Sequence, residues 1–186
     1  WDYNLSFAGF QSGSAESAVN FPIDTPVSGV SMEDRPLISQ LLAVPEYQEQ
    51  YHAYLQEILD EYFNSGLFLS TIRTIDNRIS PYIQNDPTAF YTYEEYQAGV
   101  EALKEFGLLR AQSIEGQLNG SIPSTTEGQE ADSSALIDAG DLSLTTMGTQ
   151  GGGGMGGMER GEMTFPEAGA AQQPGEESGE TASQSQ

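Results

Sequence analysis

The first residues of the chain have the types and spacing that best suit a chemical role. Asp2 stands between the aromatic residues Trp1 and Tyr3, and the amide residue Asn4 follows. Aromatic side chains can shield a carboxylate from water, and a shielded carboxylate needs a partner, most simply a metal ion. The same residues also fit an aspartate at a strand edge or in a turn, because short motifs are weak evidence. The pattern alone leaves both interpretations open.

The single histidine, His52, is the second candidate for chemistry. A Ser-His-Asp triad would depend on it entirely, yet it lies in the middle of a predicted helix with no obvious nucleophile nearby in the sequence. We therefore interpret His52 as a partly exposed helix residue. Several carboxylates fit solvated helix faces or first-turn positions in the same way: Glu57, Asp60, Glu61, Glu94 and Glu95.

The charge balance and the lack of cysteine exclude several classes of protein. The 186 residues include 28 acidic and 6 basic ones, for a net charge of −22. Nucleic-acid binding needs clustered lysine and arginine, so it is disfavoured, as is docking on an anionic membrane surface. Without cysteine there are no disulfides, zinc-thiolate sites or thiol nucleophiles. No apolar run approaches the ~20 residues of a membrane-spanning helix.

Helices between residues 36 and 118 are predicted to form the body that positions these groups. Pro36 and Pro45 stand where a first-turn proline is tolerated, and apolar residues with helical spacing follow each one. The pattern predicts a short helix that ends near Val44. A longer helix then ends at the turn Asn64-Ser65-Gly66.

A third stripe of apolar residues predicts the next helix, from Phe68 to Ile79. Pro81 is expected to bend this helix or to restart it with Ser80 as a new N-cap. The sequence Asn85-Asp86-Pro87 then breaks the chain.

The fourth predicted helix extends to Leu118 and begins with a capping signal. Thr92 and Glu95 have the Ser/Thr-x-x-Glu spacing of a capping box. Gly107 lies on its apolar stripe, where glycine costs roughly 1 kcal/mol relative to alanine. Close packing against another backbone would explain this glycine. Because the apolar stripes need one another, we predict a small antiparallel bundle.

The composition changes sharply near Asn119. Of the 18 aromatic residues, only Phe165 lies beyond this point, whereas 14 of the 21 glycines do. Such a segment offers too little apolar surface to offset the chain entropy lost on ordering. The sequence therefore predicts a disordered tail over residues 119–186.

The opening Trp1-Asp2-Tyr3-Asn4-Leu5 resembles the WDYN segment of the CotH family, the spore-coat-type atypical protein kinases. The resemblance covers about residues 1–118, and the ordered series of motifs is more specific than WDYN alone. Further stretches follow the family's C-terminal helical pattern in order: Arg35-Pro36-Leu37-Ile38, Leu41-Leu42, Val44-Pro45-Glu46-Tyr47, Tyr51-His52, Tyr54-Leu55, Ile83, Asp86-Pro87 and Leu103-Lys104 to Arg110.

The resemblance implies a mainly α chain, the helical C-terminal part of an atypical protein-kinase-like (α+β) fold. Such a kinase transfers phosphate from ATP to Ser or Thr of a protein acceptor. By resemblance Asp2 is the Mg²⁺-binding aspartate, the counterpart of the Asp in the DFG motif of ordinary kinases, and Asn4 helps to order the metal. Phosphoryl transfer depends mostly on positioning and charge neutralisation, so this carboxylate is indispensable.

The chain departs from the family pattern in one large respect. The family's nucleotide-anchoring Lys, its phosphate-covering segment and its catalytic-loop Asp precede WDYN, and this chain contains none of them. Lys104, the only lysine, cannot take the anchoring role. We therefore expect the isolated chain to be catalytically inactive.

These considerations divide the chain into three predicted regions. Residues 1–35 form a metal-binding segment and an activation-segment-like loop, residues 36–118 the helical bundle, and residues 119–186 the tail. The resemblance implies a Ser-rich, basic protein acceptor, which the net acidity would attract, and a place in a spore coat, cell envelope or the extracellular space. The alternative is a non-catalytic helical scaffold or interaction module of such a layer. An acidic Ca²⁺ module is disfavoured because no 12-residue acidic loop is present.

Overall fold

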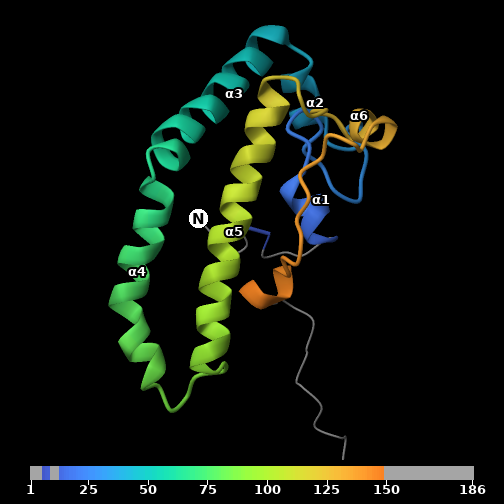
Figure 1. Ribbon diagram of the computed structural model, residues 1–186. Coiled ribbons are helices and arrows are strands. Elements are labelled where there is room, and N and C mark those ends of the chain that lie inside the picture. The colour runs from blue at the N-terminus through green and yellow to red at the C-terminus, as the bar shows by residue number, and fades with distance from the viewer. Residues whose placement is uncertain (1–5, 9–12, 149–186) are drawn as a thin grey trace, which may run out of the picture. The chain divides into compact units, whose positions relative to one another are not determined.

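Helices account for the regular structure in the part of the chain that the computed structural model describes, residues 6–8 and 13–148. No strand occurs among these residues, which confirms the mainly α fold class. All of them belong to the unit Trp1–Gly152. The elements in chain order are α1 (Ala15–Val19), α2 (Pro36–Leu42), α3 (Pro45–Ile58), the π-helix η1 (Leu59–Asn64), α4 (Leu67–Gln84), α5 (Tyr93–Leu118), α6 (Thr126–Ala131) and the 3₁₀ helix η2 (Leu144–Met147) (Figure 1).

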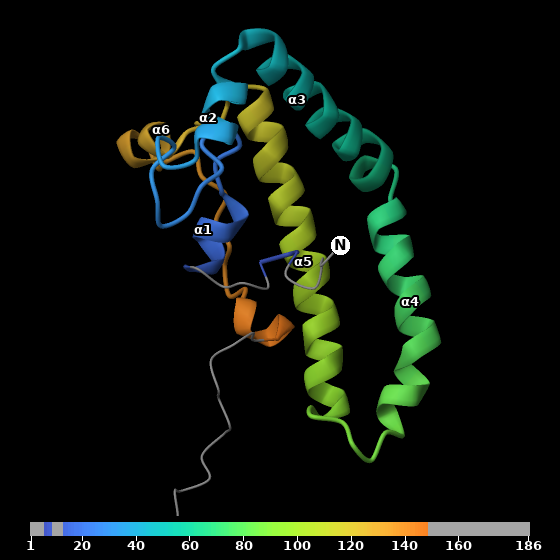
Figure 2. The ribbon, with the colours of Figure 1, turned by 180° about the vertical axis from the view of Figure 1, so that it is seen from behind.

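Helices α4 and α5 run antiparallel side by side and are joined by the loop of residues 85–92 (Figure 2). The predicted capping box starts α5: Thr92 Oγ1 accepts a hydrogen bond from the Glu95 amide at 3.2 Å, and Glu95 Oε2 accepts one from the Thr92 amide at 2.7 Å. The two helices are also linked by the Tyr96 hydroxyl, which donates to Asp76 at 2.7 Å. The predicted start and end of α5 are confirmed.

Pro81 does not restart α4, so this part of the prediction is wrong. The helix continues through Pro81 to Gln84. A proline removes only its own hydrogen bond to the carbonyl four residues earlier and crowds that carbonyl, so a helix can continue through it. Ser80 is not an N-cap; its hydroxyl is hydrogen-bonded to the Tyr93 hydroxyl at 2.7 Å.

Helix α3 and the π-helix η1 together form the predicted second long helix. Pro45 occupies the first turn of α3, as expected. The chain leaves η1 through Gly66, whose φ of 78° is the left-handed conformation that glycine adopts most readily. The predicted turn at Asn64-Ser65-Gly66 is confirmed.

Gly107 is explained by close packing, but against a side chain and not a backbone. A Cβ atom on Gly107 would lie 2.2 Å from Cζ of Phe68. Phe68 is 2% exposed and comes from α4. Because Gly107 has no side chain, the Phe68 ring packs directly against α5.

Residues 119–148 differ from the sequence prediction, which placed them in the tail. Ile122 is buried beside Gly116 of α5, where a Cβ atom would meet its side chain at 2.5 Å. Further along, buried aliphatic side chains join Val19, Ala102 and Phe106 in one apolar core: Ala139, Leu142 and Leu144. A few small aliphatic residues suffice here because α5 presents a face of small residues on which the segment lies closely. The part of the chain from 149 on lies outside the described residues.

The region predicted as a metal-binding segment and a loop, residues 1–35, contains the short helix α1. Ser14 caps it, accepting a hydrogen bond from the Ser17 amide at 3.1 Å. Val19 at its end is fully buried in the core. This segment is thus packed on α5, while residues 28–31 beyond it are exposed.

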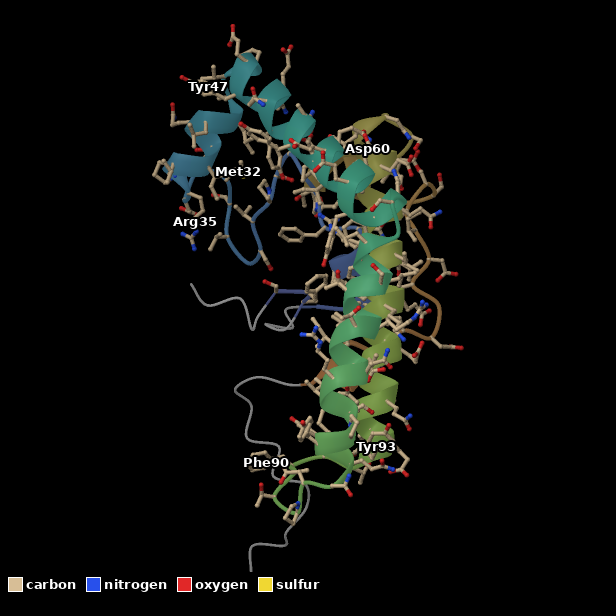
Figure 3. The ribbon with its side chains drawn as sticks, turned by 90° about the vertical axis from the view of Figure 1, so that its left-hand side faces the viewer. Met32, Arg35, Tyr47, Asp60, Phe90 and Tyr93 are labelled. Atoms are coloured by element: carbon tan, nitrogen blue, oxygen red, sulfur yellow. The ribbon has the colours of Figure 1, made fainter. Side chains whose placement is uncertain are left out.

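The apolar stripes of α3 and α4 are only partly covered. Helix α5 is also contacted by α1 and η2, so α3 and α4 each meet it along a limited seam. Figure 3 shows Tyr47 on α3 and Phe90 on the loop before α5. The apolar side chains of α3 and α4 that are more than 40% exposed are Tyr47, Tyr54, Ile58, Leu67, Ile75, Ile79 and Tyr82. None of the described helices has the length and apolar character needed to cross a membrane.

Candidate functional site

The two residues predicted to hold the metal, Asp2 and Asn4, lie outside the described residues. The nearest described part of the chain is the turn Ser6-Phe7-Ala8. Phe7 and Ala8 have φ values of 55° and 61°, the left-handed region that residues other than glycine rarely adopt. This turn, its contacts and the segment 13–35 that follows are the described surroundings of the predicted metal residues.

The turn Ser6-Phe7-Ala8 packs on a cluster of aromatic side chains. The Phe7 ring stacks on the Phe68 ring with centroids 5.9 Å apart and an interplanar angle of 22°. Phe68 in turn contacts Phe63 at 4.8 Å and Tyr62 at 5.8 Å, both from η1. Offset aromatic pairs of this kind contribute beyond the area they bury. The chain next to the predicted metal residues is thus tied to α4, η1 and α5.

Buried polar side chains hold the segment after α1 on α5. Asn20 is 2% exposed; its Oδ1 accepts hydrogen bonds from the Ser113 hydroxyl at 3.2 Å and from the Ile137 amide at 2.9 Å. Gln117, 4% exposed, accepts from the Ile23 amide at 2.9 Å through Oε1. Buried polar groups of this kind are costly unless paired, and these are paired. They fix the backbone of residues 20–23.

Arg110 adds a charged group to the polar side chains that hold the segment after α1. Its Nη1 donates to the carbonyl oxygens of Val19 at 3.0 Å and Phe21 at 2.6 Å. Burial lowers the pKa of Arg110 to about 10, while the nearby Tyr51 acts in the opposite direction. The guanidinium remains charged at neutral pH, so it serves as a permanent double donor to the turn after α1.

A contact between the side chains of Asp24 and His52 links this segment to α3. His52 Nε2 lies 2.7 Å from Asp24 Oδ1, and Gln48 Nε2 donates to the same oxygen at 3.0 Å. Burial acts to raise the pKa of Asp24, but hydrogen bonds from Ser124, His52 and Gln48 outweigh it, so the pKa is lowered. The side chain of His52 is 31% exposed, which confirms the partly exposed helix residue. Its contact with Asp24 connects α3 to the segment after α1, which is a structural role.

The other candidate carboxylates do not come together. Within the described residues, no group of three or more histidine, cysteine or acidic residues could hold a metal ion. Lys104 pairs with Glu101 of the same helix at 2.7 Å. Glu95 caps α5, and Asp60 accepts hydrogen bonds from Gln56 and Asn64. The remaining members of the predicted set are exposed: Glu57, Glu61 and Glu94.

Sequence reasoning missed the polar anchor of residues 19–25. Arg110, Ser113 and Gln117 are spaced three and four residues apart on α5, so they share one helix face. The helical spacing of these three polar residues on one face of α5 was the available signal. The spacing could not identify the partner of this polar row, because the partner is a segment about 90 residues earlier in the sequence.

Two cavities border the turn Ser6-Phe7-Ala8. One, of about 880 Å³, reaches toward α1 and Arg110, and the other, of about 850 Å³, follows α5 toward Phe90. All three residues of the turn line both cavities. The turn therefore separates two open spaces.

Comparison with known proteins gives a family. The model of the family described as CotH kinase protein matches residues 1–114. Comparisons with curated proteins and with solved structures gave no match. The matched residues include Asp2 and Asn4, the anchored segment 13–35 and most of α5. Since this is more than half of the 186 residues, the chain belongs to the CotH kinase protein family.

Proposed function

We propose that the chain is the helical C-terminal part of a CotH-like protein Ser/Thr kinase that transfers phosphate from ATP to a spore-coat or surface protein. The observation that carries the proposal is the family match over residues 1–114, which includes the WDYN segment. A protein acceptor that is Ser-rich and basic would suit the net charge of −22. The proposed location is a spore coat, a cell envelope or the extracellular space.

Asp2 is the proposed metal ligand, and Asn4 supports it. A carboxylate and an amide supply hard oxygen donors, the kind that Mg²⁺ takes in proteins. Asp2 and Asn4 would hold Mg²⁺, which would supply neutralisation of the charge on the phosphates. In the transfer itself the acceptor hydroxyl oxygen bonds to the γ-phosphorus, the bond to the bridging oxygen of ADP breaks, and the hydroxyl proton passes to a base. By resemblance that base is the catalytic-loop Asp that precedes WDYN.

The second part of region 1–35 is the proposed activation-segment-like loop, and residues 13–35 are its described part. Its first part is held by Arg110, Gln117 and Asn20, whereas residues 28–31 are exposed. This arrangement supports a platform whose anchored part orients an exposed loop toward the acceptor. For the isolated chain we infer no phosphate transfer, because the nucleotide-anchoring Lys and the catalytic Asp are not among its residues.

Intact-mass spectrometry tests the proposal. The protein extended upstream of Trp1 is incubated with Mg-ATP and a Ser-rich basic acceptor, next to its Asp2→Ala variant. We expect gains of about 80 Da per phosphate in the unaltered protein and none in the variant, because phosphoryl transfer needs the metal-holding carboxylate. Equal gains in both proteins would contradict the role of Asp2, and no gain in either would contradict the kinase.

A second candidate is a non-catalytic helical scaffold or interaction module. The observation that favours it is the row of exposed apolar side chains on α3 and α4, including Tyr54 and Ile75. Exposed apolar surface of this extent commonly marks contacts with other proteins. A protein that shows no mass gain but binds another envelope protein through this row would fit the scaffold.

A further inference from the structure

The turn Ser6-Phe7-Ala8 is strained, and it stands four residues after the proposed metal ligand. Phe7 and Ala8 are consecutive non-glycine residues with φ of 55° and 61°. Such a conformation persists only where the surroundings hold it, and it is often found next to functional sites. The contacts that hold this turn therefore bear on function.

In the described part of the chain, the Phe7 stack and the packing of Ala8 hold the turn. The turn also lines two cavities of about 880 and 850 Å³, so open space borders it. Ala8 packs against the apolar core, and the Phe7 ring, itself 43% exposed, stacks on Phe68. Phe7 thus supplies the aromatic contact that ties the turn to α4.

Gly107 sets the position of this contact. A Cβ atom at residue 107 would lie 2.2 and 2.5 Å from Cζ and Cε1 of Phe68, closer than real Cβ contacts allow. Any side chain there would displace the Phe68 ring. The position of the Phe7 ring on Phe68 therefore depends on a glycine of α5, a hundred residues away in the sequence.

We propose that Phe7 and Phe68, seated on Gly107, are positioning residues for the metal-binding segment. They hold the chain at Ser6-Phe7-Ala8 and so fix the point from which that segment extends. Four peptide units join Asp2 to Ser6, so Asp2 lies within about 14 Å of Ser6. The inference rests on the proposed function only for its effect on activity, because that effect requires Asp2 to hold Mg²⁺.

Trp1 is the only tryptophan in the chain, so its fluorescence tests the anchor without any metal or substrate. Acrylamide quenching of Trp1 is measured in the 186-residue chain, in Phe7→Leu and in Phe90→Leu. Phe90 is the matched control because it is 96% exposed and its ring packs on little. We expect Phe7→Leu to raise the quenching constant toward that of the urea-unfolded chain, and Phe90→Leu to leave it unchanged. Equal constants in the unaltered chain and Phe7→Leu would overturn the inference.

A pair of variants separates positioning from folding. Gly107→Ala forces the Phe68 ring out, so we expect a lower thermal midpoint and higher quenching of Trp1. Adding Phe68→Leu removes the ring atoms that the new Cβ would meet, so the midpoint should recover in part. Phe7 still lacks its aromatic partner in this double variant, and the quenching should stay high. Recovery of both quantities would show that the stack only stabilises the fold, against the inference.

The effect on activity is measured in the protein extended upstream of Trp1. We expect Phe7→Leu to raise the Mg²⁺ concentration for half-maximal phosphate transfer about tenfold, as loss of an outer-shell partner does. The KM for ATP at saturating Mg²⁺ should not change. An unchanged Mg²⁺ requirement would overturn the positioning role. If the unaltered protein transfers no phosphate, the proposed function fails, and the Trp1 measurements still decide whether the anchor exists.

Discussion

At the scale of single residues, Asp24 shows how an exposed-looking loop residue acquires a structural role. Its carboxylate receives His52 at 2.7 Å and Gln48 at 3.0 Å, both from α3. Its own amide donates to the Ser124 carbonyl at 2.9 Å. One residue therefore joins the segment after α1, helix α3 and the segment after α5, although nothing in its sequence neighbourhood points to either partner.

The lowered pKa of Asp24 predicts a pH-dependent contribution to stability. Its pKa lies below the ordinary value of 3.8 when folded, so the stabilisation is complete above that value and is lost as the pH falls through the folded pKa. We expect Asp24→Asn to lower the free energy of unfolding at pH 7 and the difference from the unaltered protein to shrink below pH 3.8. Urea unfolding at several pH values measures it.

The control for this prediction is Glu49→Gln, an exposed carboxylate on the same helix as His52. Such a surface change is expected to stay within about 0.5 kcal/mol at every pH. A difference for Asp24→Asn that does not vary with pH would contradict the assignment of the stabilisation to the carboxylate.

At the scale of elements, α5 is the helix on which the others are assembled. It contacts α1, α3, α4, η1 and η2, and its small residues allow these close approaches. Its own start depends on local sequence, because Thr92 and Glu95 satisfy each other's backbone amides. A helix that is contacted on several sides needs a well-defined first turn to keep its register.

The capping box predicts a measurable difference between two adjacent glutamates. Removing an N-terminal cap typically costs about 1 kcal/mol, so we expect Thr92→Ala to lower the free energy of unfolding by about that amount, and Glu95→Ala to lower it as well. Glu94→Ala is the matched control, since Glu94 is also in the first turn but does not take part in the box. Chemical unfolding measures all three, and an equal loss from Glu94→Ala would attribute the effect to charge at the helix end alone.

At the scale of the whole described part, residues 119–148 complete the core. Ile122, Leu142 and Leu144 are each less than 10% exposed. Fully burying such a side chain contributes about 1.5–3 kcal/mol. Three of them together are comparable with the total stability of a domain, about 5–15 kcal/mol.

This core predicts where the chain can be shortened. A chain that ends at Leu118 should lose its cooperative thermal transition, because Val19, Ala102 and Phe106 lose the aliphatic side chains that cover them. A chain that ends at Gly148 should keep the transition of the full chain. Differential scanning calorimetry of the three chains measures this, and a cooperative transition in the shortest one would contradict the role of residues 119–148.

Between residues 36 and 118 the sequence by itself determined the helices and several of their ends, because these depend on near neighbours. Pro45, the turn before Gly66, and the box of Thr92 and Glu95 act within four residues, and each was predicted as it is found. Pro81 was expected to bend α4 or to restart it, and the restart was wrong, because a proline removes one helical hydrogen bond and need not end the helix. The ordered motifs also sufficed to indicate the family that residues 1–114 match.

Only the tertiary structure decided which distant residues meet. Asn20 with Ser113, Asp24 with His52, Phe7 with Phe68 and Gly107, and the packing of residues 139–144 are contacts between segments tens of residues apart. Composition predicted that residues 119–148 would lack enough apolar surface, since it counts side chains without the surface that receives them. Burial depends on complementary shape, and the small residues of α5 supply that shape only when the chain is folded.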